Sequence, residues 1–386
     1  MTQSFYDRLL VPPRQSFFLF GPRGTGKSTW VRRIFKDVRR FDLLDEALYQ
    51  SYLGDPTLFA GELRSLRPGN TVCVDEVQRL PSLLNEVHRF IEDRRLRFIL
   101  CGSSARKLKR EGTNLLAGRA LQRYLHPFVP AELGADFNLE TALTYGTLPV
   151  IWQSAERKES LLAYARLYLK EEIQAEALVR NLPGFARFLP LAALFHGQTL
   201  NVASLARDAG ASRTTISGYV EILEDTLLAF RLPAFEARLR VREKKHPKLY
   251  WADAGIVRAI KQQLAAPSAE ERGALFEGWI ANLLRAYRDY RDLFDDWSYW
   301  APAEAAQTEV DFLLRRGHDW IAIEAKAARR IANDELRGLR AIEDLQRLKR
   351  RILVHPGDRP RVTEDGIEIW PVHTFLEALD SDRLWP

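Results

Sequence analysis

The feature that most constrains this chain of 386 residues is a glycine-rich segment that follows a short apolar run, SFFLF, at residues 16–20. The segment, Gly21-Pro-Arg-Gly-Thr-Gly-Lys-Ser-Thr29, fits the pattern G-x-x-x-x-G-K-[ST] and opens a helical pattern. That context favours a phosphate-binding loop over an ordinary turn. Backbone N–H groups of such a loop close around phosphates, its lysine reaches the β- and γ-phosphates, and its serine hydroxyl binds Mg²⁺. We therefore predict ATP and Mg²⁺ as cofactors, held by Gly21, Gly24, Thr25, Gly26, Lys27, Ser28 and Thr29.

Two further apolar runs end in polar residues that suit nucleotide chemistry. The run Val72-Cys-Val leads to Asp75 and Glu76. We predict that Asp75 lies on the metal side and that Glu76 polarises the water that attacks the γ-phosphate. The run at residues 98–102 leads to Ser103, which would lie near the γ-phosphate if its strand lies between the other two. The alternatives are a solvated acidic pair and a small polar residue of the kind that commonly ends a strand.

Short apolar runs and helical patterns alternate over residues 1–135. This alternation predicts an α/β fold with a parallel sheet covered on both faces. The predicted strands are 16–20, 39–44, 71–76, 96–103 and 119–127.

Composition narrows the class of protein. Hydrophobic residues make up 46% and charged residues 28%, which excludes a largely disordered or fibrous chain. The sequence holds no stretch of about 18 uncharged apolar residues, so we expect no membrane partner. Asp7, Arg8 and Arg14 interrupt the N-terminal segment where a signal peptide would be apolar, so we expect a cytoplasmic protein. Cys73 and Cys101 lie in apolar runs and are predicted to be buried thiols.

Arg119 lies in the segment LLAGRALQRY, between a predicted helix and the fifth predicted strand. In an assembled ring this position faces the nucleotide of the neighbouring subunit, where an arginine can neutralise charge in the transition state. Arg106 and Arg110 are the alternatives for this role. A surface salt bridge or a charge at a helix C-terminus would also explain an arginine at position 119.

These motifs carry a resemblance. Together with Asp75-Glu-Val-Gln-Arg-Leu-Pro81, and with Gly-Ser-Ser followed by Leu-Ala-Gly-Arg119, they resemble an AAA-type ATPase. More narrowly, they resemble the bacterial and archaeal AAA_14/DUF4143 family, whose C-terminal part is the DUF4143 domain, over nearly the whole chain. The resemblance implies an ASCE-type sheet with strand order 5-1-4-3-2. We expect a homo-oligomer in the form of a hexameric ring.

The middle of the chain predicts a helix-turn-helix. Leu205-Ala206 would pack the first helix, Gly210 would end it, Ser212 would cap the second, and Ile216, Tyr219 and Leu223 would form its buried stripe. Arg213, Thr214, Thr215 and Ser217 then lie where DNA would be contacted. A basic segment follows that could form a wing on phosphate: Arg238, Arg240, Arg242, Lys244, Lys245 and Lys248. We expect DNA as a partner; the alternative is a winged helix that serves as an ATPase lid or a protein contact.

The C-terminal part brings together acidic residues and a lysine. Period-2 alternation predicts a hairpin that gathers Asp311, Glu324 and Lys326 on one side, with Glu277 on the preceding helix. The pattern Asp-x(12)-Glu-x-Lys resembles the PD-(D/E)xK nuclease core, although Val310 stands where that name has proline. Glu277, Asp311 and Glu324 would hold Mg²⁺, and Lys326 would orient the hydrolytic water. The alternatives are a solvated polar face and a nuclease fold kept only to hold DNA or to assemble.

We therefore predict three domains: an AAA-type ATPase domain (1–135), a helical lid and winged helix-turn-helix (136–265), and a restriction-endonuclease-like α/β domain (266–386) that begins with a linker at 266–273. The leading hypothesis is ATP-driven DNA processing with metal-dependent cutting, for which branched DNA such as a Holliday junction is a candidate substrate. The alternative is a nucleotide-dependent switch whose nuclease-like domain is catalytically silent.

Overall fold

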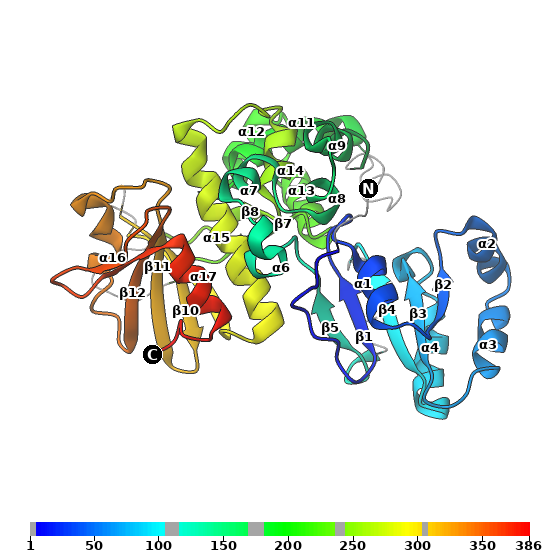
Figure 1. The fold of residues 1–386 in the computed structure, drawn as a ribbon. Coiled ribbons are helices and arrows are strands. Elements are labelled where there is room, and N and C mark those ends of the chain that lie inside the picture. Colours follow the sequence, from blue (N-terminus) through cyan, green and yellow to red (C-terminus); the bar gives the residue numbers. More distant parts are fainter. Residues whose placement is uncertain (1–4, 105–115, 169–180, 236–243, 303–307) are drawn as a thin grey trace. The chain divides into compact units, whose positions relative to one another are not determined.

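A parallel sheet of five strands forms the smaller of two structural units in this computed structural model (Figure 1). The structure describes residues 5–104, 116–168, 181–235, 244–302 and 308–386. The smaller unit comprises residues 8–127 and 225–228, and the larger unit comprises residues 1–7, 128–224 and 229–386. The elements of the smaller unit are β1 (Phe17–Phe20), α1 (Lys27–Ile34), β2 (Arg39–Asp42), α2 (Glu46–Gly54), α3 (Thr57–Arg64), β3 (Thr71–Asp75), η1 (Val77–Arg79), α4 (Leu83–Arg94), β4 (Arg97–Gly102) and β5 (Leu121–Tyr124).

The strand order confirms the expectation that came from the family resemblance. The sheet runs β2-β3-β4-β1-β5, which is 5-1-4-3-2 read from the other edge, and its neighbouring strands are parallel. The five predicted strands are present, each one to five residues shorter than predicted. Because β4 lies between β1 and β3, the carboxyl ends of these three strands meet at one edge of the sheet. Ligands of open α/β sheets bind at that edge.

Alternation along the strands explains why helices cover both faces of this sheet. Phe18 and Phe20 of β1 belong to a core cluster that also contains Phe59 of α3 and Phe90 of α4. Phe17 points to the opposite face, where its ring packs edge-on against Trp30 of α1 with 6.3 Å between the centroids. Each face of the sheet is therefore buried under helices, as the near-continuous apolar runs require.

Short helices open the larger unit. They are α6 (Pro130–Leu133), η3 (Gly134–Asp136), α7 (Leu139–Tyr145), α8 (Pro149–Trp152), α9 (Arg157–Ala163), η4 (Tyr164–Tyr168) and α11 (Leu182–Leu194). Pro183 and Gly184 lie in the first turn of α11, where proline is tolerated because its missing N–H would have no partner inside the helix. The side chain of Asn181 caps that turn by accepting from the Gly184 N–H at 3.0 Å.

The helix-turn-helix elements are present as predicted. They are α12 (Val202–Asp208) and α13 (Arg213–Asp225), accompanied by a three-stranded antiparallel sheet of β6 (Gln198–Thr199), β7 (Ala229–Leu232) and β8 (Lys248–Trp251) in the order β6-β8-β7. Gly210 adopts a left-handed φ of 61° in the turn between the helices. The Ser212 hydroxyl accepts from the Thr215 N–H at 3.1 Å, which is the expected cap. The predicted stripe of α13 is buried.

A mixed sheet of six strands forms the C-terminal part, after α14 (Ala254–Ile260) and the 23-residue helix α15 (Ala269–Arg291). Its order is β13-β14-β12-β11-β10-β9. The remaining elements are β9 (Asp296–Trp300), β10 (Val310–Arg316), β11 (Asp319–Ala325), η5 (Asn333–Leu336), α16 (Arg337–Ala341), β12 (Leu348–His355), β13 (Arg361–Val362), β14 (Glu368–Pro371) and α17 (Val372–Asp380). The predicted hairpin is β10–β11. The sheet has more strands than this hairpin: β9 precedes it, β12–β14 follow it, and the helix α17 is the last element.

Backbone hydrogen bonds join the middle sheet to the C-terminal sheet, which is why both belong to one unit. The Phe235 N–H donates to Tyr299 O at 2.7 Å, and the Tyr299 N–H donates to Pro233 O at 3.0 Å. The Lys244 N–H donates to Ala301 O at 2.9 Å. The predicted linker is partly helical, since α15 begins at Ala269. A domain boundary near residue 265 stays a prediction.

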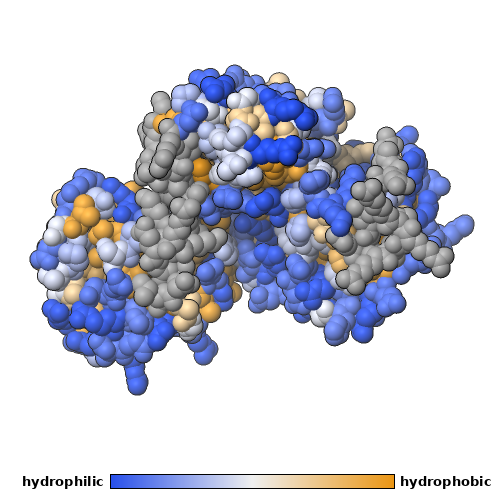
Figure 2. Space-filling view, turned by 180° about the vertical axis from the view of Figure 1, so that it is seen from behind, coloured by the Kyte–Doolittle hydropathy of each residue, from blue (hydrophilic) through white to orange (hydrophobic). Residues whose placement is uncertain are grey.

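Figure 2 shows a mostly hydrophilic face on which hydrophobic patches are small. Large apolar side chains that are well exposed include Val11, Leu194 and Val362, which lie far apart in the sequence. Scattered residues of this kind are ordinary on protein surfaces. Among the residues that the structure describes, no helix has both the length and the apolar character that crossing a membrane requires.

Candidate functional site

The glycine-rich loop of the smaller unit has the shape that a phosphate site needs. Gly24 and Gly26 adopt left-handed φ angles of 81° and 85°, which L-residues with side chains rarely adopt. Lys27 is buried, and its Nζ donates to Gly21 O at 2.7 Å and to Pro22 O at 3.3 Å. Its side chain therefore folds back over the loop. The N–H groups of the first turn of α1, at Lys27, Ser28 and Thr29, have no helical partner and suit an anion.

Glu76 and Ser103 meet at the carboxyl edge of the sheet. Gln78 of η1 links them, since its Nε2 donates to Glu76 Oε2 and lies 3.1 Å from Ser103 Oγ. The Ser103 hydroxyl also donates to Glu76 Oε2 at 3.3 Å. Glu76 has a left-handed φ of 54°, which is costly for a residue with a side chain and is often found at functional sites. Gln78 is a site residue that the sequence analysis did not single out.

ATP and Mg²⁺ fit the residues of this edge. Lys27 supplies positive charge, Ser28 a hydroxyl, and Asp75, at the end of β3, a half-buried carboxylate that also accepts from the Glu76 N–H at 3.2 Å. Hydroxyl and carboxylate oxygens are ligands that Mg²⁺ prefers. When bound, the ion would neutralise phosphate charge. The assignment of roles to Gly21, Thr25, Thr29 and the other loop residues stays a prediction.

Arg8 is a second residue of this site that sequence analysis did not find. Its guanidinium donates to Thr25 O at 2.8 Å and to His126 O, so it ties the glycine-rich loop to the segment after β5. Because it lies 17 residues before Thr25, no local pattern connects it to the loop. Cys73 and Cys101 are buried free thiols, as expected. Hydrogen bonding to Cys73 and burial raise the pKa of Cys101, so this thiol is protonated and inert.

Arg119 lies just before β5 and is exposed, which is the predicted place in the chain. It forms an ion pair with Glu92 of α4, and this contact lowers the pKa of Glu92. The ion pair matches the surface salt bridge that was one of the alternatives. Action on a neighbouring nucleotide stays a prediction. Arg106 and Arg110 lie outside the described residues.

A carboxylate cluster lies in the larger unit, and we define it as Glu277, Glu309, Asp311 and Glu324. Asp311 and Glu324 are buried, and the other two are partly exposed. The hairpin brings Asp311 and Glu324 together as predicted: the Asp311 N–H donates to Glu324 Oε2 at 3.3 Å, and the Ala325 N–H donates to Asp311 Oδ2 at 3.0 Å. Lys326 Nζ donates to Glu324 Oε1. Asp311 and Glu324 are 1% and 3% exposed, which is inconsistent with the alternative of a solvated polar face.

Lys248 lies inside the carboxylate cluster. Its Nζ is 2.8 Å from Glu277 Oε1, 3.0 Å from Asp311 Oδ1 and 3.2 Å from Glu309 Oε1. The Tyr250 hydroxyl, two residues further along β8, donates to Glu277 Oε1 at 2.5 Å. Successive side chains of a strand alternate in direction, so Lys248 and Tyr250 share one face of β8. That period-2 spacing was the signal that could have found both residues.

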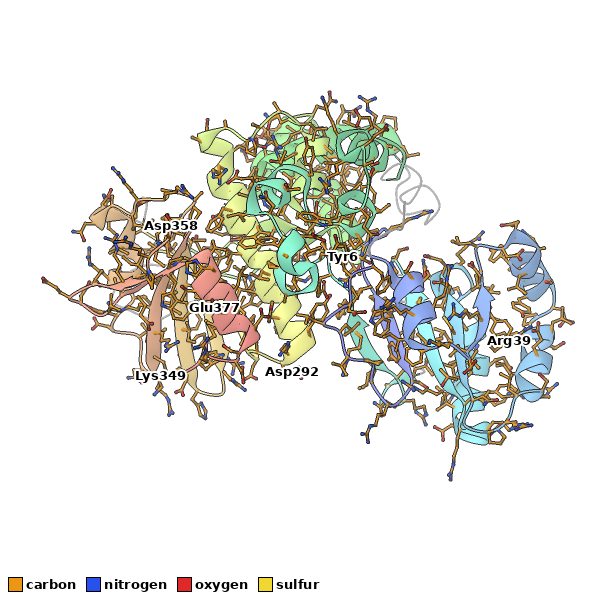
Figure 3. The ribbon with its side chains drawn as sticks, in the orientation of Figure 1. Tyr6, Arg39, Asp292, Lys349, Asp358 and Glu377 are labelled. Atoms are coloured by element: carbon orange, nitrogen blue, oxygen red, sulfur yellow. The ribbon has the colours of Figure 1, made fainter. Side chains whose placement is uncertain are left out.

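Lys248 therefore does not belong to the basic wing, and that part of the prediction was wrong. Its side chain is 2% exposed, whereas the side chain of Lys349 of β12, labelled in Figure 3, is 41% exposed. Lysines are rarely buried unless carboxylates replace their hydration shell, and three carboxylates do so here. Of the other predicted wing residues, Lys244 and Lys245 are described, and Arg238, Arg240 and Arg242 lie outside the described residues.

The charges of the cluster are unevenly distributed. Burial and the nearby Asp311 carboxylate raise the pKa of Glu277 to about 7, and the same two causes raise the pKa of Glu324 well above its usual range. Burial alone would raise the pKa of Asp311, but the ammonium groups of Lys248 and Lys326 outweigh it and lower that pKa. Burial opposes the charge of Lys248, yet the surrounding carboxylates raise its pKa well above the usual value. Asp311 is thus the carboxylate held ionised between two cations.

The cluster as it stands does not fit a divalent metal ion. The ammonium group of Lys248 lies where an ion bound by Glu277 and Asp311 would lie, and Lys326 takes up an oxygen of Glu324. Within the described parts of the chain, no group of three or more histidine, cysteine, aspartate or glutamate side chains is arranged to hold a metal ion. Mg²⁺ binding by Glu277, Asp311 and Glu324 stays a prediction, and it requires that these oxygens first lose their bonds to the two ammonium groups.

Comparison with protein families assigns three consecutive parts of the chain. Residues 13–134 match the AAA domain, residues 136–266 match a domain of unknown function, DUF8612, and residues 272–375 match a domain of unknown function, DUF4143. Two curated relatives, uncharacterized proteins of Mycobacterium tuberculosis and Mycobacterium bovis, are each 26% identical to this chain over 378 residues, which is 95% of this chain and 82% of theirs.

Solved structures show only distant similarity. The ORC1 protein of Aeropyrum pernix in complex with DNA has a TM-score of 0.29 and 13% identity, over 65% of this chain and 87% of that chain. The replication initiator DnaA, bound to AMPPCP and single-stranded DNA, has a TM-score of 0.26 and 12% identity, over 56% of this chain and 83% of that chain.

The family matches agree with the motifs and with the strand order. The glycine-rich loop, the acidic pair after β3 and the order β2-β3-β4-β1-β5 all lie within residues 13–134, and the β10–β11 hairpin lies within residues 272–375. Residues 13–134 therefore belong to the AAA family of P-loop ATPases, and residues 272–375 belong to the DUF4143 family.

Proposed function

We propose that this protein hydrolyses ATP at the carboxyl edge of the five-stranded sheet and uses the cycle to act on DNA. The observation that carries the proposal is the hydrogen-bonded group of Glu76, Gln78 and Ser103, which lies at the strand ends next to the loop of Lys27. In this mechanism Lys27 neutralises phosphate charge, Glu76 accepts a proton from the attacking water, and Ser103 and Gln78 hold the Glu76 carboxylate in place.

The DNA part of the proposal rests on the described face of the helix-turn-helix. Arg213, Thr214 and Ser217, at the N-terminal end of α13, are exposed, while the opposite face of α13 is buried. The N-terminal end of a second helix is the part that meets base edges or phosphates in helix-turn-helix proteins. Lys244 and Lys245, about 30 residues further along the chain, add positive charge to the middle of the protein. Branched DNA such as a Holliday junction is one candidate substrate, and a hexameric ring is the proposed assembly.

ATP turnover with and without DNA tests this function. The rate should rise when single-stranded, duplex or branched DNA is added to the full-length protein. Lys27→Ala should abolish nucleotide binding, because it removes the charge that neutralises the phosphates. Glu76→Gln should still bind ATP, yet hydrolyse it about 10²–10⁴-fold more slowly, because the water loses its base. Turnover by Glu76→Gln at the wild-type rate would refute the assignment of the base.

A second candidate function is a nucleotide-dependent switch whose DUF4143 domain has no nuclease chemistry. The position of Lys248 within the carboxylate cluster favours it, because the oxygens that a nuclease metal would need are bound to an ammonium group. Slow ATP turnover that none of the three kinds of DNA changes would support this candidate. Cleavage of DNA with Mg²⁺ or Mn²⁺ that Asp311→Ala abolishes, while ATP turnover remains, would exclude it.

A further inference from the structure

The carboxylate cluster already contains a cation that belongs to the chain. An ammonium group has three N–H donors, and Glu277, Glu309 and Asp311 each accept one of the three hydrogen bonds of Lys248. The side chain also lies over the ring of Tyr299, with 5.5 Å between Nζ and the centroid. Its hydrogen-bonding capacity is therefore filled, and its charge is surrounded by oxygen and an aromatic face.

Separate elements deliver the cation and its partners. Lys248 comes from β8 of the middle sheet, Glu277 from α15, and Asp311 and Glu324 from the two strands of the hairpin. Backbone hydrogen bonds fix this arrangement. β8 pairs with β6 on one side and with β7 on the other. The Phe235 N–H bonds to Tyr299 O of β9, and the Lys244 N–H bonds to Ala301 O, directly after β9. Lys248 is thus held in the cluster by the sheet from which it projects.

A divalent ion would compete with Lys248 for the same oxygens. Mg²⁺ binds carboxylate oxygens at about 2.0–2.1 Å and needs several of them, or waters, around it. Asp311 and Glu277, the carboxylates that could act together with Glu324, both face the ammonium group. Two cations placed within one buried cluster repel each other strongly, so the ion and the lysine exclude each other.

We propose that Lys248 is an internal cation that closes the carboxylate cluster to divalent metal ions, and that removing its charge converts the cluster into a Mn²⁺-binding site. The proposal goes beyond the function proposed above, since it concerns the larger unit and requires neither nucleotide nor DNA. It gives the DUF4143 domain a dormant metal site whose ligands are Glu277, Asp311 and Glu324.

Titration of the full-length protein with Mn²⁺ alone, by calorimetry and by the electron paramagnetic resonance of free Mn²⁺, tests the proposal. If Lys248 occupies the cluster in about 99% of molecules, it weakens the apparent Mn²⁺ affinity about 100-fold. Lys248→Met keeps the length of the side chain and removes its charge, so this variant should bind one Mn²⁺ at least about 100-fold more tightly than the wild type. Mn²⁺ should also raise the melting temperature of this variant and leave the wild type unchanged.

Two controls separate this site from general effects of charge. Lys261→Met removes another partly buried lysine of the same unit, whose partner is Glu271 at 3.0 Å, and it should leave Mn²⁺ binding at the wild-type level. Adding Asp311→Asn to Lys248→Met should abolish the gained binding. Lys248→Met combined with Glu309→Gln removes one positive and one negative charge, so it leaves one carboxylate fewer without a partner than Lys248→Met alone. Glu309 is the most exposed carboxylate that Lys248 contacts.

Three results would overturn the proposal. The first is a folded Lys248→Met, or Lys248→Met with Glu309→Gln, that binds Mn²⁺ no better than the wild type. The second is a wild type that already binds Mn²⁺ as tightly as the variants. The third is failure of both variants to fold with or without Mn²⁺, which would make Lys248 a structural tie alone. None of these results bears on ATP turnover, so this proposal and the proposed function can fail separately.

Discussion

His196 shows how burial fixes the protonation of one residue. Its imidazole is 3% exposed, and Nδ1 accepts from the Trp251 N–H at 3.1 Å, so the single proton of the neutral ring lies on Nε2. Nε2 faces Gly278 of α15, where a side chain would overlap the ring. Burial, with a smaller effect of Lys261, lowers the pKa of His196 to about 3. The absence of a side chain at Gly278 of α15 thus leaves the space that the ring of His196, in the loop before β6, occupies.

This residue predicts a loss of stability in acid. Between pH 6.5 and about 3 the unfolded chain binds a proton at His196 and the folded chain does not, so the free energy of unfolding falls as the pH falls through this window. The slope from one such group approaches about 1.4 kcal/mol per pH unit. His196→Gln keeps an acceptor for the Trp251 N–H and removes the titration. Its stability should therefore depend less steeply on pH.

Urea unfolding at pH 7, 6 and 5 measures that difference. The wild type and His196→Gln should converge in stability as the pH falls, even if the variant is less stable at pH 7 because the ring no longer fills its site. His373→Gln, on an exposed position of α17, is the control for loss of a histidine and should follow the wild type. Parallel pH dependence of the wild type and His196→Gln would contradict the prediction.

At the scale of elements, local patterns predicted α12, α13 and the strands of the five-stranded sheet because each carries its own signal. Ser212 caps α13 and Ile216 is buried, and both follow from spacing within one helix. Lys248, at the centre of the carboxylate cluster, shares only a period-2 spacing with Tyr250, and this spacing does not show what their face of β8 contacts. Lys248 lies close to Lys244 and Lys245 in the sequence, and the sequence therefore placed it with them in the basic wing. The carboxylates that bury Lys248 lie 29 to 63 residues away, so no local pattern connects them with it.

The segment that ends at Lys244 and Lys245 supports a prediction about DNA. Replacing both lysines by glutamine should weaken binding to the same extent for different sequences, because phosphate contacts carry no sequence information. Each lost contact should lower the slope of log affinity against log salt by about one unit. Filter binding or fluorescence anisotropy at several salt concentrations measures both effects.

A matched pair elsewhere on the larger unit is the control. Arg347 and Lys349 both pair with Asp319 at the surface of the C-terminal sheet. Replacing both by glutamine removes the same positive charge, and we expect the salt dependence of DNA binding to remain at the wild-type slope. Equal effects of the two double variants would mean that the net charge of the protein, and not the segment at Lys244 and Lys245, governs binding.

At the scale of the whole molecule, the sequence predicted which helices and strands occur. It did not predict that the middle sheet and the C-terminal sheet are joined by hydrogen bonds. The five-stranded sheet followed from apolar runs, whereas its order came from the family resemblance. The bonds of Phe235 and Lys244 to β9 and its end connect segments more than 50 residues apart, and no local pattern reports them. The same holds for Arg8, whose contact with the His126 carbonyl spans 118 residues.

Assembly into a ring is tested by mixing two inactive variants. Arg119 is exposed and its ion pair with Glu92 is at the surface, where such pairs contribute little, so the arginine is free to exchange partners. If it acts on the neighbour's ATP, Arg119→Ala and Glu76→Gln should each lack ATP turnover, yet their mixture should regain part of it. Some interfaces then pair the intact Glu76 of one subunit with the intact Arg119 of the other.

Lys27→Ala mixed with Glu76→Gln should regain nothing, because both changes damage the same half of the site. No recovery despite demonstrated subunit exchange, or turnover by a strictly monomeric protein, would limit Arg119 to its ion pair with Glu92.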